Sequence, residues 1–262
     1  MKTLKTITII CAIAVLSLAC RRTIEPEGEV SATFMVESPM TKAFGDGASA
    51  TELSVRVFDA NHNFLYDQAA SRGESGWTVT LNLVPGTYSF SFWACSSTAD
   101  AFSFDGEYMT LSYPLMDMNS DAEDSFWASV ADMDLTSSFE RSITLKRPFA
   151  FMQVVSDGFI NESLEGATSA FSVAGALCTR LNLITGAADE AVRSVSYTAA
   201  PVSFNTIGRH AIVAAAYALV PEDGLTASKV DYTVTFKDGR HASGTVYDVP
   251  LARNYRTNLK DY

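Results

Sequence analysis

Along most of the chain, hydrophobic and polar residues alternate with a period of two, which is the pattern of half-buried β-strands. Pro85-Gly86 separates two such runs and predicts a hairpin between them. Residues 96–139 lose the alternation and gather Asp, Asn, Ser and Met, so we expect a long loop region with brief helical or strand pieces. The strands predicted in the first half of the chain cover 30–37, 52–59, 64–68, 77–84 and 87–95.

A second β run opens at Arg141, and Lys146-Arg147-Pro148 interrupts it, because proline disfavours a continuous strand. The turn 237–240 predicts another hairpin, and no segment of twelve or more residues carries a convincing helical stripe. Short strands with regular turn signals indicate β-sandwiches, so we predict an N-terminal domain over 30–146 and a C-terminal domain over 147–262. The later strands are predicted over 169–174, 177–184, 194–199, 210–220, 232–236, 242–247 and 256–261.

The first 19 residues predict a lipoprotein signal peptide. Lys2 and Lys5 precede an apolar stretch that is too short to span a bilayer stably, and the stretch ends in LSLAC at Cys20. A small residue directly before the cysteine suits signal peptidase II, so we predict a lipid on Cys20 and a polar tether over 20–29. The alternative is an ordinary secretory signal that happens to contain a cysteine.

Composition narrows the classes of protein. The chain has 262 residues, of which 47% are hydrophobic, so it can bury a sizeable core. Only 19% are charged, which disfavours long solvent-facing helices, and a net charge of −11 makes nucleic acid a poor partner. Cys95 and Cys178 would remain after export; we favour buried free thiols, and a disulfide between them stays open.

Catalytic motifs are absent. Gly73-Glu74-Ser75-Gly76 is one residue short of a nucleophile elbow, and the chain has no phosphate-binding loop, dinucleotide fingerprint or HExxH zinc motif. His62, His210 and His241 fit surface or structural positions better than a base or a metal ligand. We therefore predict a protein that is not an enzyme, with no catalytic residue, cofactor or metal.

Two groups of residues remain as candidate ligand contacts. The acidic segment 117–124 carries four carboxylate side chains and one amide, from Asp117, Asn119, Asp121, Glu123 and Asp124; we favour a solvated loop there and leave an irregular calcium site open. Trp93 and Trp127 are candidate contacts for sugars, because aromatic faces suit pyranose rings, although core packing explains some of these aromatics equally well.

Specific strings resemble the fimbrillin-like lipoproteins of the Bacteroidota, whose studied members are type V pilus subunits, anchors or accessory proteins. ELSVRVFD after GDG, within 42–59, and Phe92-Trp93-Ala94 fit the same group. The resemblance implies two tandem transthyretin-like (Greek-key) β-sandwich domains, export as a lipoprotein and no catalytic activity. The strings that carry it are TLKRPFA (144–150), LNLITG (181–186), YALVP (217–221) and VPLARNYRTN (249–258).

In stalk subunits of that family, an arginine-specific protease removes the first strand and a neighbour's donor strand fills the groove. Here the linker 38–51 holds Lys42 but no arginine, and Arg56 falls inside a predicted strand; these two residues are the candidate processing sites. The chain stops at Tyr262, which leaves little tail to donate. An anchor, an accessory subunit or a stand-alone lipoprotein is therefore at least as well supported as a stalk subunit.

We thus predict a non-enzymatic, lipid-anchored cell-envelope protein that acts in pilus assembly, anchoring or adhesion through β-strand complementation. Its partners would be other fimbrillin-like subunits, and the N-terminal lipid would hold it in the outer membrane, facing the cell surface rather than the periplasm. The alternative is a surface glycan-binding lipoprotein that serves a nutrient transporter.

Overall fold

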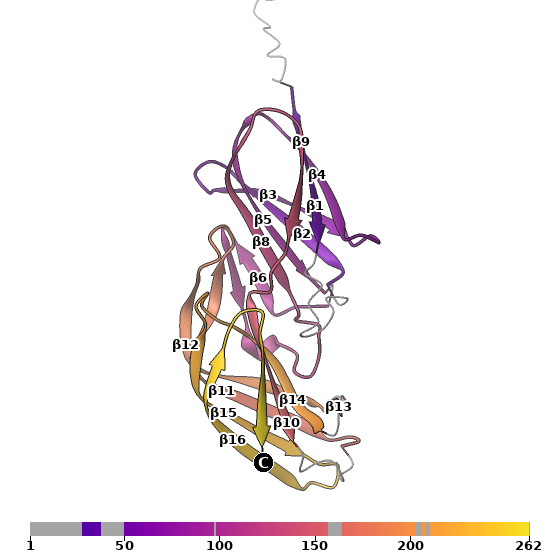
Figure 1. Ribbon diagram of the computed structural model, residues 1–262, viewed down its shortest axis with the longest axis vertical. Helices are drawn as coiled ribbons and strands as arrows, with labels where there is room; N and C mark the ends of the chain where they lie inside the picture. The colour runs from indigo at the N-terminus through magenta and orange to yellow at the C-terminus, as the bar shows by residue number, and fades with distance from the viewer. Residues whose placement is uncertain are drawn as a thin grey trace, which may run out of the picture.

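The computed structural model describes residues 28–37, 50–96, 98–156, 164–202, 206–207 and 210–261. Cys20 and Lys42, the predicted lipidation residue and one predicted processing residue, lie outside these ranges. The described chain is built of β-strands arranged in two bodies along the long axis of the molecule (Figure 1). Within the described residues, the only helical element is the 3₁₀ turn η1 (Tyr113–Leu115). The predicted all-β class is confirmed.

The first sandwich pairs a three-stranded sheet with a four-stranded sheet. Side chains from both sheets, including Phe34, Leu53 and Phe90, meet in one core cluster between them. The first sheet has the order β4 (Trp77–Leu83), β1 (Val30–Glu37), β9 (Phe139–Thr144). The second has the order β3 (Phe64–Ser71), β2 (Glu52–Phe58), β5 (Gly86–Cys95), β8 (Phe126–Leu135).

The hairpin predicted at Pro85-Gly86 is wrong, because β4 and β5 lie in different sheets. β4 pairs with β1, whereas β5 pairs with β2 on one edge and β8 on the other. β4 alternates buried and exposed residues, as expected of a strand with one wet face, but β5 buries seven consecutive residues. The proline and glycine therefore mark a turn from one sheet to the other rather than a pairing of the flanking strands.

The long loop region predicted over 96–139 is also wrong in part, because it contains the ten-residue strand β8. A bulge interrupts β8: the pairing with β5 shifts between Tyr88 and Phe90, and Asp132 takes a φ of 49°. The extra residue of a bulge breaks the period-two pattern, which explains why the alternation could not be seen in the sequence.

The second sandwich is built from two larger sheets. Its core cluster includes Phe149, Phe171, Tyr217 and Tyr232. One sheet has the order β13 (Thr206–Ile207), β14 (His210–Leu219), β10 (Phe149–Ser156), β17 (Arg256–Asp261). The other has the order β16 (His241–Leu251), β15 (Leu225–Thr235), β11 (Thr168–Asn182), β7 (Tyr108–Leu111), β6 (Phe102–Asp105), and β12 (Ala188–Pro201) also pairs with β11.

The hairpin predicted around 237–240 is confirmed, since β15 and β16 pair antiparallel from Thr235 and His241 onward. The strands predicted over 169–174 and 177–184 belong to the single strand β11. Its pairing with β12 shifts register between Ala174 and Leu177, at the place where the hydrophobic pattern broke.

The connection between β5 and β8 packs into the second sandwich, although the sequence places it in the first domain. β7 pairs with β11 at Met109 and Leu181, and the side chains that follow β7 are buried in the second core. Asn119 then binds Ala215 of β14 through two hydrogen bonds, one in each direction. A division of the chain at residue 146 therefore cuts through the second core. The buried apolar side chains of this connection are Ala101, Met109, Leu111, Tyr113, Met116 and Met118.

Candidate functional site

β1 is the central strand of the three-stranded sheet. It lies between β4, to which it runs antiparallel, and β9, to which it runs parallel. Its inward side chains Val30, Ala32, Phe34 and Val36 are all buried. Removal of β1 would leave unpaired N–H and C=O groups on both neighbours and four empty positions in the core.

The ring of Phe34 on β1 packs against three aromatic rings of the first sandwich. Its centroid lies 5.0 Å from those of Phe90 and Phe92 and 5.6 Å from that of Phe139. The opposite face of β1 carries Ser31, Thr33, Met35 and Glu37, and the hydroxyl of Ser31 donates to Oδ1 of Asn82 at 3.0 Å.

Arg56, the second predicted processing residue, is buried within β2. Its partners across the sheet are Asp67 on β3 and Ser91 on β5. Its guanidinium carbon lies 4.2 Å from the ring centroid of Phe64, and Nη2 donates to the carbonyl of Gly106 at 3.2 Å. Burial lowers the pKa of the guanidinium. Cleavage at Arg56 would require β2 to leave its sheet.

Trp93 does not form an exposed sugar platform, because it is only 1% exposed. Its ring packs edge-on against Phe102, Phe104 and Phe149, with centroids 5.2 to 6.3 Å apart. Its neighbours on β5 face the first core, whereas Trp93 belongs to the second. Trp93 therefore joins the two sandwiches.

Trp127 is half-buried at the same junction. Its indole N–H donates to the carbonyl of Leu183 at 2.9 Å, and its backbone exchanges two hydrogen bonds of 2.8 Å with Lys146. The ring covers Gly186, where an added Cβ would lie only 2.5 Å from Cη2 of Trp127. Like Trp93, Trp127 is engaged in packing, which leaves little of its ring for a sugar.

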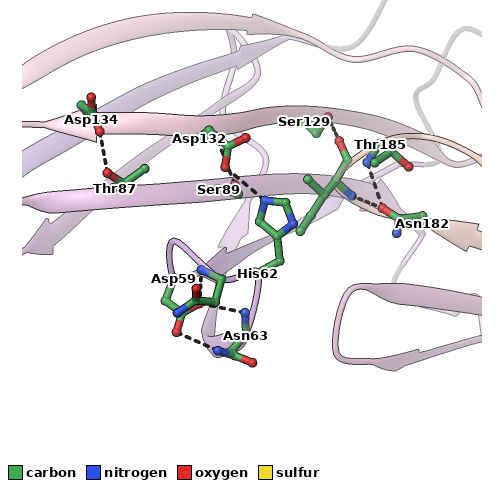
Figure 2. A network of polar contacts seen from close by, with 12 residues as sticks. Asp59, His62, Asn63, Thr87, Ser89, Ser129, Asp132, Asp134, Asn182 and Thr185 are labelled. Carbon is green, nitrogen blue, oxygen red and sulfur yellow. Dashed lines mark hydrogen bonds and ion pairs between the residues drawn. The ribbon is translucent and has the colours of Figure 1, made fainter.

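A network of polar contacts supports this junction (Figure 2). The hydroxyl of Ser129 on β8 donates to the carbonyl of Ile184 at 2.7 Å. Oδ1 of Asn182 accepts hydrogen bonds from the backbone N–H groups of Ile184 and Thr185, and so closes the LNLITG turn on which Trp127 rests.

The same network holds the turn between β2 and β3 (Figure 2). Asp59 accepts hydrogen bonds from the backbone N–H groups of Asn61 and Asn63 and from the side-chain amide of Asn63. Nε2 of His62 lies 3.1 Å from Oδ1 of Asp132 on β8. His62 and the Asp59 turn thus have structural partners, as the sequence predicted for the histidine.

The acidic segment 117–124 is not a solvated loop throughout, because Glu123 and Asp124 are buried. Asp124 forms a bidentate ion pair with the buried Arg147: Nε lies 2.5 Å from Oδ1 and Nη2 2.7 Å from Oδ2. Nη1 of Arg147 donates to Asn254 at 3.3 Å, so one side chain ties three separate segments together. Sequence reasoning missed this pair; the one available signal was an arginine directly before the apolar run PFAFM.

Glu123 lacks a comparable partner. Its residue is 1% exposed, and Oε2 makes no hydrogen bond with the described residues. Burial, with smaller contributions from the charges of Asp117 and Asp100, raises the pKa of its carboxyl to about 7. In the described part of the chain, no group of three or more His, Cys, Asp or Glu side chains is arranged to hold a metal ion.

Cys95 and Cys178, the cysteines within the described residues, are free thiols. Cys178 is buried and Cys95 half-buried, and burial raises the pKa of both thiols, that of Cys95 to about 11. Neither is therefore an activated nucleophile. Among the described residues, no helix has the length and apolar character needed to cross a bilayer.

Several solved structures share this architecture at low sequence identity. A candidate polysaccharide-binding protein (DUF1812) from Bacteroides thetaiotaomicron matches at a TM-score of 0.53 and 15% identity, over 81% of this chain and 78% of that chain. A candidate cell adhesion protein from Bacteroides ovatus matches at a TM-score of 0.50 and 12% identity, over 88% and 91%. The fimbrial anchor protein Mfa2 of Porphyromonas gingivalis gives a TM-score of 0.47 and 15% identity, over 82% of each chain.

The first two of these neighbours confirm the predicted β-sandwich fold. A model of a family of unknown function (DUF6562) matches residues 25–262. The chain belongs to this family. No curated protein matches the sequence.

Proposed function

We propose that this protein is a non-enzymatic, fimbrillin-like component of the cell envelope that acts in adhesion and joins other subunits by β-strand complementation. The observation that carries the proposal is the position of β1 between β4 and β9, with Phe34 at the centre of an aromatic pocket. The fimbrial and adhesin proteins among its structural neighbours support the same role. A lipid on Cys20 would hold the chain in the outer membrane, facing the cell surface.

Strand complementation is energetically plausible at this site. Full burial of a Val or Phe side chain contributes about 1.5–3 kcal/mol, so Val30, Phe34 and Val36 together contribute roughly 5–9 kcal/mol. The backbone hydrogen bonds of β4 and β9 add to this. A donor strand that reproduced both features would bind tightly and dissociate slowly, as assembly of a surface filament requires.

The fate of β1 separates the possible roles. A chain that keeps β1 keeps its lipid anchor and a closed groove, and so can act as an anchor or accessory subunit. A chain that loses β1 loses the anchor and can accept a donor strand. Because Arg56 is buried inside β2, a cut that released β1 would fall in the linker 38–51, where Lys42 lies, and the fate of that linker decides between the two roles.

The alternative function, a glycan-binding lipoprotein that serves a nutrient transporter, depended on Trp93 and Trp127 as ligand contacts. Both rings pack at the junction of the sandwiches. We therefore do not propose that function.

The proposal can be tested by opening the groove deliberately. A recognition site for a sequence-specific protease would be inserted in the linker 38–49. After cleavage, the N-terminal piece that carries β1 would be separated from the rest of the chain in mild denaturant. We expect the remaining chain to bind a synthetic peptide of residues 30–37 and to recover its thermal stability. The same peptide with Phe34→Glu is the matched control and should fail.

If the cleaved chain binds both peptides equally, or binds neither, the result contradicts strand complementation. The intact mass of the protein from its own cells then tests the role. A mass that begins at Cys20 with acyl chains supports an anchor or accessory subunit. A lipid-free mass that begins in or after the linker shows a stalk subunit.

A further inference from the structure

A groove of about 460 Å³ lies at the corner of the second sandwich where the chain passes from β16 to β17. This volume is within the range of small-ligand sites. Its apolar lining comes from Leu225, Pro250 and Leu251, at the end of the β15–β16 ladder. Asp223 and Tyr255 also line it.

Tyr255 presents an exposed ring on a fixed backbone. The residue is 69% exposed, yet its N–H donates to the carbonyl of Ala252 and its carbonyl accepts from the N–H of Phe151 at 3.0 Å. The preceding Asn254 takes a φ of 59°, donates its N–H to the carbonyl of Phe149 and accepts from Arg147 through its side chain. The position of this aromatic residue is thus set by the buried Arg147, while its ring faces water.

Two charged side chains line the same groove without protein partners. Asp223 and Arg256 make no side-chain hydrogen bond or ion pair with any described residue. A carboxylate accepts hydrogen bonds from hydroxyl groups, and a guanidinium donates to hydroxyl oxygens. Because their charges are opposite, they give the groove no net preference for an ion, and the net charge of −11 on the whole chain disfavours polyanions.

We propose that this groove binds a neutral hexopyranose unit of a surface glycan. The apolar face of the sugar would stack on Tyr255 and contact Leu225 and Pro250, while its hydroxyls would bind Asp223 and Arg256. Tyrosine suits this role because it supplies a large, rigid face with little conformational entropy to lose. Each contact is weak because the groove is shallow, and multivalent display on a cell surface would raise the avidity.

The inference goes beyond the proposed function, because it uses the second sandwich and needs no change at β1. Glycan binding could fail while strand complementation holds, and strand complementation could fail while glycan binding holds. The two proposals are therefore tested by separate measurements.

The experiment uses the chain from Arg21 onward, which retains every described residue. Saturation-transfer NMR would be recorded with methyl glycosides of glucose, galactose and mannose, with methyl glucuronide as the anionic comparison. The same neutral sugars on a multivalent polymer would give the avidity. We expect at least one neutral glycoside to bind, and Tyr255→Ala to weaken binding about tenfold or more.

Tyr247→Ala is the matched control, because Tyr247 is 68% exposed on β16 but does not line the groove. It should leave binding within about twofold, as should Tyr255→Phe, which keeps the ring. Asp223→Asn and Arg256→Gln should each weaken binding without changing the melting temperature. The proposal is overturned if no neutral glycoside binds, if only the glucuronide binds, or if Tyr247→Ala and Tyr255→Ala have the same effect.

Discussion

The guanidinium of Arg147 lies against the carboxylate of Asp124 with both side chains wholly inaccessible to water. Arg147 begins the second sandwich, and Asp124 ends the connection that packs into it from the first. The ring of Phe126 lies 4.7 Å from the guanidinium carbon and Asn254 takes a further N–H, so the charge is satisfied on several sides. This pair couples the two sandwiches and the loop that carries Tyr255.

Removal of one partner should therefore be costly. Arg147→Met or Asp124→Leu leaves a buried charge uncompensated, and we expect either to lower the free energy of unfolding by about 3–5 kcal/mol. The double variant should cost less than the sum of the two, because it removes both charges. Urea unfolding measures each term. As a control, Arg180→Met, in the exposed pair with Asp189, should change stability little. If Arg147→Met and Asp124→Leu lower the free energy of unfolding no more than Arg180→Met does, the buried pair does not couple the sandwiches.

Gly186 should be intolerant of a side chain for two separable reasons. Its φ of +77° strains any L-residue, and an added Cβ would lie 2.5 Å from the Trp127 ring. Gly239 has a φ of +84° but open space around it, so Gly239→Ala measures the backbone strain alone, about 1–2 kcal/mol. Gly186→Ala should cost about 1–3 kcal/mol more in thermal or urea unfolding, because Trp127 must move. Equal costs at the two glycines would show that the ring does not depend on this turn.

The second sandwich should not fold alone. A fragment of residues 147–262 lacks β6 and β7, and it also lacks Tyr113, whose hydroxyl donates to the carbonyl of Cys178 at 2.9 Å. We expect this fragment to lose cooperative unfolding and to bind a hydrophobic dye. Coexpression with residues 28–146 should restore cooperative unfolding and abolish dye binding. Cooperative unfolding of the isolated fragment at the stability of the whole chain would refute this expectation.

Glu123 should make stability depend on pH in the weakly acidic range. Its folded pKa of about 7 lies above the ordinary value of 4.5, so the folded state holds a proton that the unfolded state has released. Stability should then fall as the pH rises from about 4.5 to 7 and level off above, because proton binding favours the folded state in that window. One pKa unit corresponds to about 1.4 kcal/mol, and the expected loss is of order 1–3 kcal/mol.

Glu123→Gln should remove this component and be more stable than the parent chain above pH 7. Urea unfolding across the pH range gives the comparison, and Glu165→Gln, at an exposed position, is the control. A pH profile that stays the same in the Glu123 variant would assign the dependence to other groups.

Much of the strand content was predictable because period-two alternation is a local consequence of the β backbone. The strands β1 and β17 have the predicted bounds, and the β15–β16 hairpin has its predicted turn. The prediction failed in β8, where the bulge at Asp132 disrupts the alternation. The candidate site was harder to predict, because its residues come together only through long-range pairing.

The sequence by itself determined the all-β class, most strand positions and the resemblance to fimbrillin-like proteins. The first two follow from the local alternation of hydrophobic and polar residues, and the third follows from short sequence strings. Only the tertiary structure decided which strands pair, that β4 and β5 separate into different sheets, and that Asp124 meets Arg147. It also decided that Trp93 and Trp127 pack between the sandwiches while Tyr255 faces water. The physical reason is that alternation specifies two faces for a strand but not the partner that covers each face. That choice depends on contacts between residues far apart in the chain.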